Sequence, residues 1–266
     1  MLELEGKVAI VTGAGRLRGI GRAAAVSLAR LGANVVVTGT GRDPSNYPQD
    51  EKEIGWKDIY STAEQIKLEG AKALPLVSNV ASSQSVSEMV NQTLSEFGRI
   101  DILVNNAAAA RGEDRVPIVD LPDDIFRKVN DIKVFGTYLC TKAVVKVLKE
   151  QGQGGKIVNI SSTAGKSGSA NTLAYNAANF AVVGMTQSMA RELGPLGINV
   201  NCVCPGFTET SRMDGLDLDQ GADKTAIGRI GTDDEVGDFI AYLCTKATSW
   251  ITGQSINVNG GSIVEH

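Results

Sequence analysis

The chain has 266 residues, of which 42% are hydrophobic and 21% are charged, and its formal net charge is −4. This length and composition suit one globular domain over residues 1–266 with a full hydrophobic core. The small negative charge gives no electrostatic basis for binding nucleic acid or an anionic membrane, and no apolar run approaches the ~18 residues of a membrane span. We therefore expect neither nucleic acid nor a membrane as a partner.

The N-terminus and the cysteines indicate the compartment. Residues 1–7 lack a basic region followed by an apolar one, which argues against a signal peptide. Cys202 and Cys204 lie two apart in an expected strand and share a face, but a metal site would need a second pair of ligands. The only histidine is His266, the last residue. We expect no metal site, and buried free thiols in a reducing cytoplasm.

Apolar, β-branched runs alternate along the chain with longer stretches of helical periodicity. The expected strands are Lys7–Thr12, Asn34–Thr38, Ala73–Val77, Asp101–Val104, Lys156–Ile160, Asn199–Val203 and Ser255–Val258. The alternation predicts an α/β fold with a doubly wound, seven-stranded parallel sheet, and the near-continuous apolar strands imply burial on both faces. Pro75 counts against the third strand because proline cannot donate to a ladder.

A glycine-rich turn joins the first expected strand to the first helix. Gly13, Gly19 and Gly21 lie in this turn, and helical spacing of apolar residues then continues as far as Gly32, which is placed to end the helix. Such a turn lets backbone N–H groups approach a pyrophosphate, whose charge the helix N-terminus favours. The pattern predicts a Rossmann-like dinucleotide site, with these residues as ligands: Gly13, Arg16, Arg18, Gly19, Ile20 and Gly21.

Two long polar stretches interrupt the regular pattern. Residues 39–57 exceed an ordinary connection between a strand and a helix, and predict an ordered flap or a mobile loop. Residues 208–224 are rich in Asp, Gly and Thr and are expected to close over the ligand as a lid. The stretch 109–120, with Arg111, Glu113, Asp114 and Arg115, is expected to border the substrate pocket.

The segment around Tyr175 resembles the Ser…Tyr-x-x-x-Lys signature of the short-chain dehydrogenase/reductase family. Ser162 lies thirteen residues before Tyr175, but Asn179 stands where the signature has lysine. The stretch Phe126–Thr141 resembles the family segment that carries an asparagine three residues before a glycine, and Lys133 holds that position before Gly136. The family's asparagine and lysine therefore look exchanged in this chain.

Further stretches between Lys7 and Gly261 are similar to the same family. They are Asn79-Val80, Asn105-Asn106-Ala107-Ala108 and Pro205-Gly206-Phe207-Thr208-Glu209-Thr210. The resemblance implies hydride transfer between a nicotinamide cofactor and a ketone, aldehyde or alcohol. It also implies these cofactor-binding residues: Gly39, Arg42, Asn79, Val80, Asn105, Ala107, Asn179, Pro205, Gly206, Thr208 and Thr210.

The resemblance also implies the catalytic roles. Tyr175 would be the acid for carbonyl reduction and the base for alcohol oxidation, and Ser162 would bind the substrate oxygen. A free tyrosine titrates near 10, and a cation within about 4–6 Å lowers that pKa by ~1–3 units. Asn179 can bind ribose hydroxyls but supplies no charge. Lys133 can supply it if its side chain points inward.

Three alternatives stay open at this stage. Lys133 is a surface lysine if it points outward, and Asn130 is the family asparagine if the helix register differs. If no cation replaces the missing lysine, the chain is a catalytically impaired relative that binds NADP(H) as a redox sensor. A reductase with intact chemistry is the interpretation that we adopt.

The residue at the end of the second expected strand helps to distinguish NAD(H) from NADP(H) as the cofactor. NAD-binding proteins usually carry a carboxylate there for the ribose hydroxyls, and Gly39 holds that position. Arg18, Arg42 and Arg16 are candidates to bind a 2′-phosphate, or are solvated surface charges. We expect NADP(H) to be preferred, with NAD(H) as the alternative. The resemblance implies a homotetramer or homodimer, built on the helix after Asp123 and on residues 251–261, in the cytoplasm.

Overall fold

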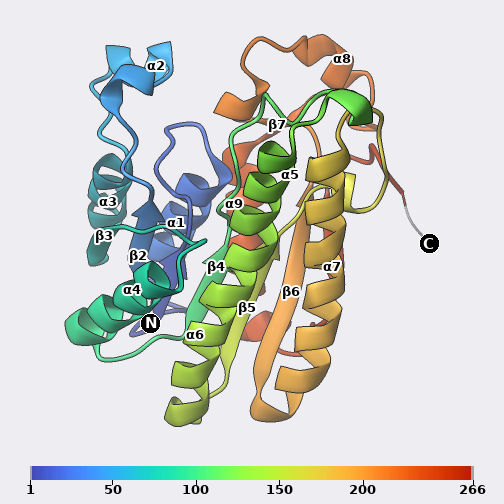
Figure 1. Cartoon of the computed structure of the whole chain (residues 1–266). Coiled ribbons are helices and arrows are strands. Elements are labelled where there is room, and N and C mark those ends of the chain that lie inside the picture. The colour runs from blue at the N-terminus through green and yellow to red at the C-terminus, as the bar shows by residue number, and fades with distance from the viewer. Residues whose placement is uncertain (1, 265–266) are drawn as a thin grey trace.

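A seven-stranded parallel sheet forms the centre of the computed structural model, which describes residues 2–264 (Figure 1). His266, considered above as a metal ligand, lies outside the described residues. In spatial order the strands are β3 (Ala73–Val77), β2 (Asn34–Gly39), β1 (Val8–Val11), β4 (Ile102–Asn105), β5 (Gly155–Ile160), β6 (Ile198–Pro205) and β9 (Ser255–Val258). Every neighbouring pair is parallel. This confirms the predicted sheet.

Pro75 is accommodated because its strand lies at the edge of the sheet. β3 pairs only with β2, with Pro75 opposite Val37. A proline on an edge strand costs no ladder hydrogen bond on its solvent side. The third expected strand therefore forms with the bounds that the sequence predicted.

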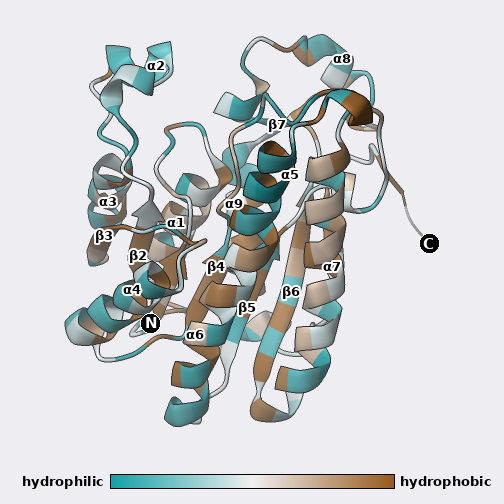
Figure 2. Ribbon diagram, in the orientation of Figure 1, coloured by the Kyte–Doolittle hydropathy of each residue, from teal (hydrophilic) through white to brown (hydrophobic). Residues whose placement is uncertain are grey.

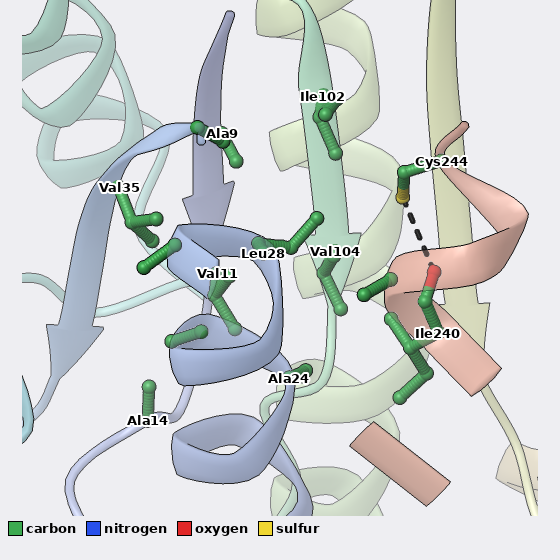
Figure 3. Packing of buried hydrophobic residues seen from close by; sticks show 14 of the residues in the cluster. Ala9, Val11, Ala14, Ala24, Leu28, Val35, Ile102, Val104, Ile240 and Cys244 are labelled. Atoms are coloured by element: carbon green, nitrogen blue, oxygen red, sulfur yellow. Dashed lines mark hydrogen bonds between the residues drawn. The ribbon is translucent and has the colours of Figure 1, made fainter. Parts of the chain in front are cut away.

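Helices cover both faces of the sheet. One face carries α1 (Ile20–Arg30), α3 (Ile59–Leu68) and α9 (Asp233–Leu243), and the other carries α4 (Ser83–Phe97), α6 (Gly136–Gln151) and α7 (Leu173–Leu193). Successive side chains of a strand enter opposite clusters, so that Val35 and Val37 pack on the α1 side and Val36 on the other. Figure 3 shows Val11, Val35 and Val104 against Leu28 of α1.

The helix expected over Phe126–Thr141 has three parts. It begins as α5 (Asp123–Asn130), continues through the π-helical turn η3 (Asp131–Phe135) and becomes α6. In Figure 2 the strands of the sheet are largely brown, whereas α5 and α2 (Gln49–Glu53) are teal. Shorter elements complete the chain: η1 (Pro44–Asn46), η2 (Ile118–Asp120), η4 (Thr163–Gly165), η5 (Gly194–Leu196), β7 (Thr208–Glu209), η6 (Ser211–Met213), α8 (Leu218–Ala222), β8 (Gly231–Thr232) and η7 (Lys246–Thr248). Across residues 2–264, no helix is both long and apolar enough to span a bilayer.

Residues 40–57, which we call the flap, are ordered and fold onto the glycine-rich turn. Glu51 of α2 is fully buried, and its carboxylate accepts from the backbone N–H of Leu17 at 3.0 Å and from Arg42 Nη1 at 2.8 Å. Trp56 Nε1 donates to the carbonyl of Gly15 at 2.7 Å. The flap therefore supplies hydrogen-bond partners to the residues of the turn.

We predict that Glu51→Gln weakens this contact. The substitution keeps the shape of the side chain but removes a buried charge that pairs with Arg42, so the free energy of unfolding should fall by about 1–3 kcal/mol. Denaturant unfolding of the purified protein measures the change. Glu53→Gln is the control because Glu53 is exposed on the same helix and its carboxylate bonds only Gln49 among residues 2–264. Equal effects of the two substitutions would contradict the role given to Glu51.

Candidate active site

A cleft of about 670 Å³ lies at the carboxyl ends of the strands. The glycine-rich turn, the ends of β2 and β4, the loop after β4 and the segment after β6 all line it. Many of the predicted cofactor ligands meet there: Gly13, Arg16, Arg18, Gly19, Ile20, Gly21, Gly39, Arg42, Asn79, Val80, Ala107 and Thr210. This edge is where an open parallel sheet binds ligands.

The glycine-rich turn has the shape that a pyrophosphate needs. Gly13 has a φ of +68°, and a Cβ there would lie 2.8 Å from the Cα of Ala107. A Cβ on Gly21 would lie 2.6 Å from the carbonyl oxygen of Gly13. Asn106 Nδ2 ties the turn to β4 by donating to the carbonyls of Thr12 and Gly13 at 2.9 Å each. The backbone is therefore open at the helix N-terminus, and the residues fit a dinucleotide.

Five predicted cofactor ligands do not line the cleft: Asn105, Asn179, Pro205, Gly206 and Thr208. Asn105 is buried, and its amide donates to Thr141 Oγ1 at 3.0 Å and to Asn159 Oδ1 at 2.9 Å. Pro205, Gly206 and Thr208 continue β6 toward Thr210, which does line it. The structure shows that the side chain of Asn105 bonds other buried side chains, and its contact with a cofactor stays a prediction, as do those of the other four.

Two of the arginines in the cleft form ion pairs with carboxylates. Arg18 donates to Asp50 at 2.6 Å and to Asp214 at 2.7 Å, and these bonds raise the pKa of its guanidinium. Arg42 contacts Glu51 and Asp58; burial lowers the pKa of Arg42, but the two carboxylates outweigh it and the net shift is upward. The charge of both arginines is therefore largely neutralised within the protein.

Arg16 differs from both of them. Its side chain lines the cleft and has no hydrogen bond or ion pair with any residue in 2–264. Burial, followed by repulsion from Arg42, lowers the pKa of its guanidinium. Arg16 is thus the least compensated cation beside the glycine-rich turn.

Asp58 is a cleft residue that the sequence did not indicate. It lies directly after the flap with a φ of 53°, and its Oδ2 is 3.6 Å from the position of a Cβ on Gly39. A carboxylate therefore lies near the end of β2 after all, although it comes from a residue nineteen positions further along the chain. Only the path of the flap reveals this, so no local sequence pattern could have found it.

Helix α7 and the short helix η4 position Tyr175 and Ser162. Tyr175 is half-buried in the first turn of α7, and Ser162 precedes η4, with its Oγ accepting from Ala164 N at 3.1 Å. The amide of Asn176 fastens the two elements together, because it donates to the carbonyls of Ala164 at 2.8 Å and Ser167 at 3.0 Å. The serine and the tyrosine therefore come from neighbouring elements, as the resemblance implies.

Asn179 lies one turn after Tyr175 and is buried. Its Nδ2 donates to the carbonyl of Tyr175 at 2.8 Å, whereas its Oδ1 is buried without a hydrogen-bond partner among the described residues. A buried acceptor without a donor is costly. A ribose hydroxyl could supply that donor, so Asn179 also fits a bound dinucleotide.

Lys133 lies in the π-helical turn and points into the protein. It is 5% exposed, and the π-helical turn packs on α7. Burial, followed by repulsion from Arg212, lowers the pKa of Lys133 to about 8, and the thiols of Cys202 and Cys204 on β6 act in the opposite direction. The alternative of a surface lysine is therefore excluded. π-helical turns are frequent at functional sites.

Asn130 does not take the place of Lys133. Its amide donates to the carbonyl of Phe126 one turn earlier at 2.8 Å. Asn130 instead lines a shallow apolar depression with Phe135, Tyr138 and Met185, away from the cleft. Lys133, and not Asn130, is therefore the buried residue of the two, and its correspondence with the family's asparagine stays a prediction.

Two guanidinium groups contact the ring of Tyr175. Arg115, from the loop after β4, lies 4.1 Å from the ring centroid, and Arg212, from η6, lies 5.6 Å from it. Both arginines line the cleft, whereas Ser162, Tyr175 and Lys133 are not among its lining residues, so the arginines form the wall of the cleft next to the tyrosine ring. The sequence placed Arg115 at the substrate pocket and Arg212 in the lid, but nothing in it indicated that they meet over Tyr175.

Known proteins resemble the chain over almost its whole length. A family model described as enoyl-(acyl carrier protein) reductase matches residues 13–262. A 3-oxoacyl-(acyl-carrier-protein) reductase of Synechocystis is 36% identical over 99% of this chain and 100% of its own length. The short-chain reductase protein NovJ of Streptomyces niveus is 36% identical over 96% of this chain and 93% of its own.

Solved structures agree with these relatives. A putative short-chain alcohol dehydrogenase from Sinorhizobium meliloti superposes with a TM-score of 0.85 at 28% identity, covering 98% of this chain and 97% of that one. A mutant of a Serratia marcescens short-chain dehydrogenase/reductase superposes with a TM-score of 0.84 at 32% identity, covering 98% of this chain and 99% of that one. With the sheet order, the glycine-rich turn and the serine and tyrosine beside it, these matches show that the chain belongs to the short-chain dehydrogenase/reductase family.

Proposed function

We propose that the protein interconverts a ketone or aldehyde and an alcohol by hydride transfer, with Tyr175 as the acid or base. The observation that carries this proposal is the placement of Ser162 directly before η4 and of Tyr175 in the first turn of α7, two elements that the amide of Asn176 fastens together. Membership of the family and the reductase names of the relatives support it. A spectroscopic assay of reduced cofactor consumption over a panel of carbonyl compounds tests it.

In this proposal each residue has a defined task. A bound nicotinamide dinucleotide supplies or accepts the hydride. Ser162 donates a hydrogen bond to the substrate oxygen, and Tyr175 gives that oxygen a proton in reduction or removes one in oxidation. Asn179 accepts from a ribose hydroxyl through its unpartnered Oδ1. The glycine-rich turn holds the pyrophosphate.

Lys133 is the candidate for the positive charge that Asn179 does not provide. Its burial lowers its pKa to about 8, so most of it is still charged at pH 7. This shift from 10.5 corresponds to a cost of about 3 kcal/mol for the folded protein at neutral pH. A buried lysine with this cost is common at functional sites, which supports a role for Lys133 in place of the family lysine.

We predict that Lys133→Met lowers carbonyl reduction by about 10²-fold or more, nearly as far as Tyr175→Phe. The same variant should be more stable than the wild type at pH 7 by up to about 3 kcal/mol. That gain should vanish as the pH rises from about 8 to 10.5, because the folded wild type then loses the costly proton before the unfolded chain does. Initial rates and denaturant unfolding across this pH range provide both measurements.

Two further variants test whether Lys133 and Asn179 have exchanged the roles of the family's lysine and asparagine. Lys133→Asn combined with Asn179→Lys rebuilds the family arrangement, and it should recover activity beyond either single change, which is strong coupling in a double-mutant cycle. Lys128→Met removes an exposed lysine of α5 and should change neither rate nor stability. Full reduction by Lys133→Met would show that Tyr175 works without this lysine.

One observation favours a second function. The guanidinium groups of Arg115 and Arg212 lie at the ring of Tyr175, and a protein that does not turn over a substrate would tolerate side chains in that position. In that case the chain is a relative that binds NADP(H) and senses the redox state of the cofactor pool. Tight binding of NADPH without consumption over the whole carbonyl panel would identify this alternative.

We propose NADP(H) as the preferred cofactor and NAD(H) as the alternative. Gly39 carries no side chain to repel a 2′-phosphate, and Arg16 is the least compensated cation beside the glycine-rich turn. Arg18 and Arg42 contribute less to the preference for NADP(H) than the sequence suggested, because each already forms ion pairs with carboxylates. Asp58 beside Gly39 opposes the preference.

The preference for NADPH should decrease when the charge of Arg16 is removed and increase when the charge of Asp58 is removed. We predict tighter binding of NADPH than of NADH, with Arg16→Ala weakening NADPH selectively and Asp58→Asn increasing the selectivity for it, each by roughly tenfold. Fluorescence titration of both cofactors at fixed ionic strength measures the ratio. Tighter binding of NADH by the wild type would rule the preference out.

We also propose a homotetramer, with a homodimer as the alternative, in the cytoplasm. Phe135 and Tyr138 on the helix after Asp123 stack at 5.8 Å between ring centroids and remain 46% and 43% exposed. Phe180 on α7 is 45% exposed, and Trp250, next to the C-terminal segment, is fully exposed. Exposed aromatic groups of this kind mark protein interfaces. All four cysteines are buried, and none forms a disulfide within residues 2–264, which supports a reducing compartment.

We predict that light scattering gives a mass four times that of one chain at micromolar concentration. Replacing Phe135 and Phe180 with serine should lower the mass, because both side chains would lie in a dry interface. Ile227→Ser is the control, since Ile227 is 66% exposed and lies outside these helices. A monomer mass for the wild type would contradict the assembly.

A further inference from the structure

The wall of the cleft at Tyr175 consists of two arginines from distant parts of the chain. Arg115 follows β4 and Arg212 follows β6, and their guanidinium groups lie 4.1 and 5.6 Å from the ring centroid of Tyr175. Both line the same cleft as the glycine-rich turn. Whatever reacts at the Tyr175 hydroxyl must therefore lie within reach of these guanidinium groups.

The positive charge at this place is only partly compensated. The side chain of Arg115 is 19% exposed, and its Nε is buried without a hydrogen-bond partner among the described residues. Asp114, the nearest carboxylate, is 3.6 Å from that Nε, and it already accepts from Gly112 N. Arg212 Nη1 donates to the carbonyl of Ala109 at 2.6 Å, which is a neutral acceptor.

Other cations lie near the two arginines. Burial is the main cause that lowers the pKa values of Arg115 and Lys133, and repulsion from Arg212 adds to both. Arg16 is subject to the same repulsion. An uncompensated buried charge is unfavourable unless a ligand of opposite sign completes the site.

We propose that the substrate carries a carboxylate near its reacting carbonyl or hydroxyl group, and that Arg115 and Arg212 bind that carboxylate. The proposal rests on the proposed function and names the substrate class for it, the oxo acids and the corresponding hydroxy acids. A guanidinium group binds a carboxylate through two parallel hydrogen bonds, and Arg115 and Arg212 both line the cleft beside Tyr175.

The phosphates of the cofactor are the competing anions. The pyrophosphate cradle is the turn that contains Gly13 and Gly21, where Arg16 lies, and Arg212 is near enough to Arg16 to repel it. The binding test is therefore made on protein that already holds the cofactor, so that its phosphates are in place. Arg115 and Arg212 lie at the ring of Tyr175, which is the reacting residue in the proposed function. The bound carboxylate would also join the loop after β4 to the segment after β6, and so orient the substrate across Tyr175.

The test pairs acids with their neutral esters. 4-Oxopentanoate and 5-oxohexanoate, each with its methyl ester, are assayed for turnover, and the same acids are titrated by calorimetry into protein saturated with oxidised cofactor. The variants are Arg115→Met, Arg212→Met and Arg115→Lys. The control is Arg127→Met, which removes an exposed arginine of α5 far from the cleft.

We expect the acids to bind to the wild type and to Arg127→Met. Kd should rise roughly tenfold to a hundredfold in Arg115→Met and Arg212→Met, with partial recovery in Arg115→Lys, because each lost guanidinium removes charge-assisted hydrogen bonds. The KM for the acids should rise in parallel, while the KM for the esters and the Kd for the cofactor stay unchanged.

Failure of the carboxylate site and failure of the proposed reductase activity give different results. Acids that bind no better than their esters, or binding that is the same in all variants, would overturn the carboxylate site. Turnover of the esters as fast as the acids would overturn it as well, while leaving the proposed reductase activity intact. Binding of the acids through Arg115 and Arg212 without turnover of any compound would instead contradict the proposed activity and support the carboxylate site.

Discussion

Burial of the parallel sheet on both faces is the constraint on which the rest of the molecule depends. Successive side chains of β1 and β2 enter opposite hydrophobic clusters, each covered by helices. Neither face leaves room for a ligand, so polar chemistry is confined to the edge where the strands end. The loops after β1, β2, β4 and β6 meet at that edge and form the cleft. The candidate catalytic side chains lie beside it because their helices begin there.

Positive charge gathers at this edge in a chain whose net charge is −4. Burial lowers the pKa of Lys133 to about 8, and it also lowers the pKa of Arg115. These shifts mean that folding is opposed by the charged forms of both groups. Neutral side chains of similar volume would serve the fold at least as well. The arrangement is therefore explained by what it binds or stabilises during the reaction, and hardly by what it adds to the free energy of unfolding.

The sequence predicted the parts of the structure that depend on local pattern. All seven strands of the sheet form near their expected bounds, including the strand with Pro75, because apolar runs and turn residues determine strands locally. The inward direction of Lys133 followed from its register with Gly136. The sequence could not indicate that Asp58 lies against Gly39, or that Arg115 and Arg212 meet over Tyr175. These contacts join loops far apart in the chain, and only the path of the flap and of the segment after β6 brings them together.

The flap divides the charges of the cleft into two groups. Its carboxylates Asp50 and Glu51 hold Arg18 and Arg42, so the end near β2 is close to neutral. At the tyrosine end no carboxylate of comparable geometry faces Arg212 among residues 2–264, and Arg115 has only Asp114 at 3.6 Å. Two places in the cleft therefore keep positive charge for an anion, one at Arg16 beside the glycine-rich turn and one at Arg115 and Arg212 beside Tyr175, and the Coulomb energy at both grows as solvent is excluded. If the substrate carries a carboxylate as proposed, the flap affects its binding without touching it, because the flap neutralises Arg18 and Arg42, which would otherwise compete for the same anion.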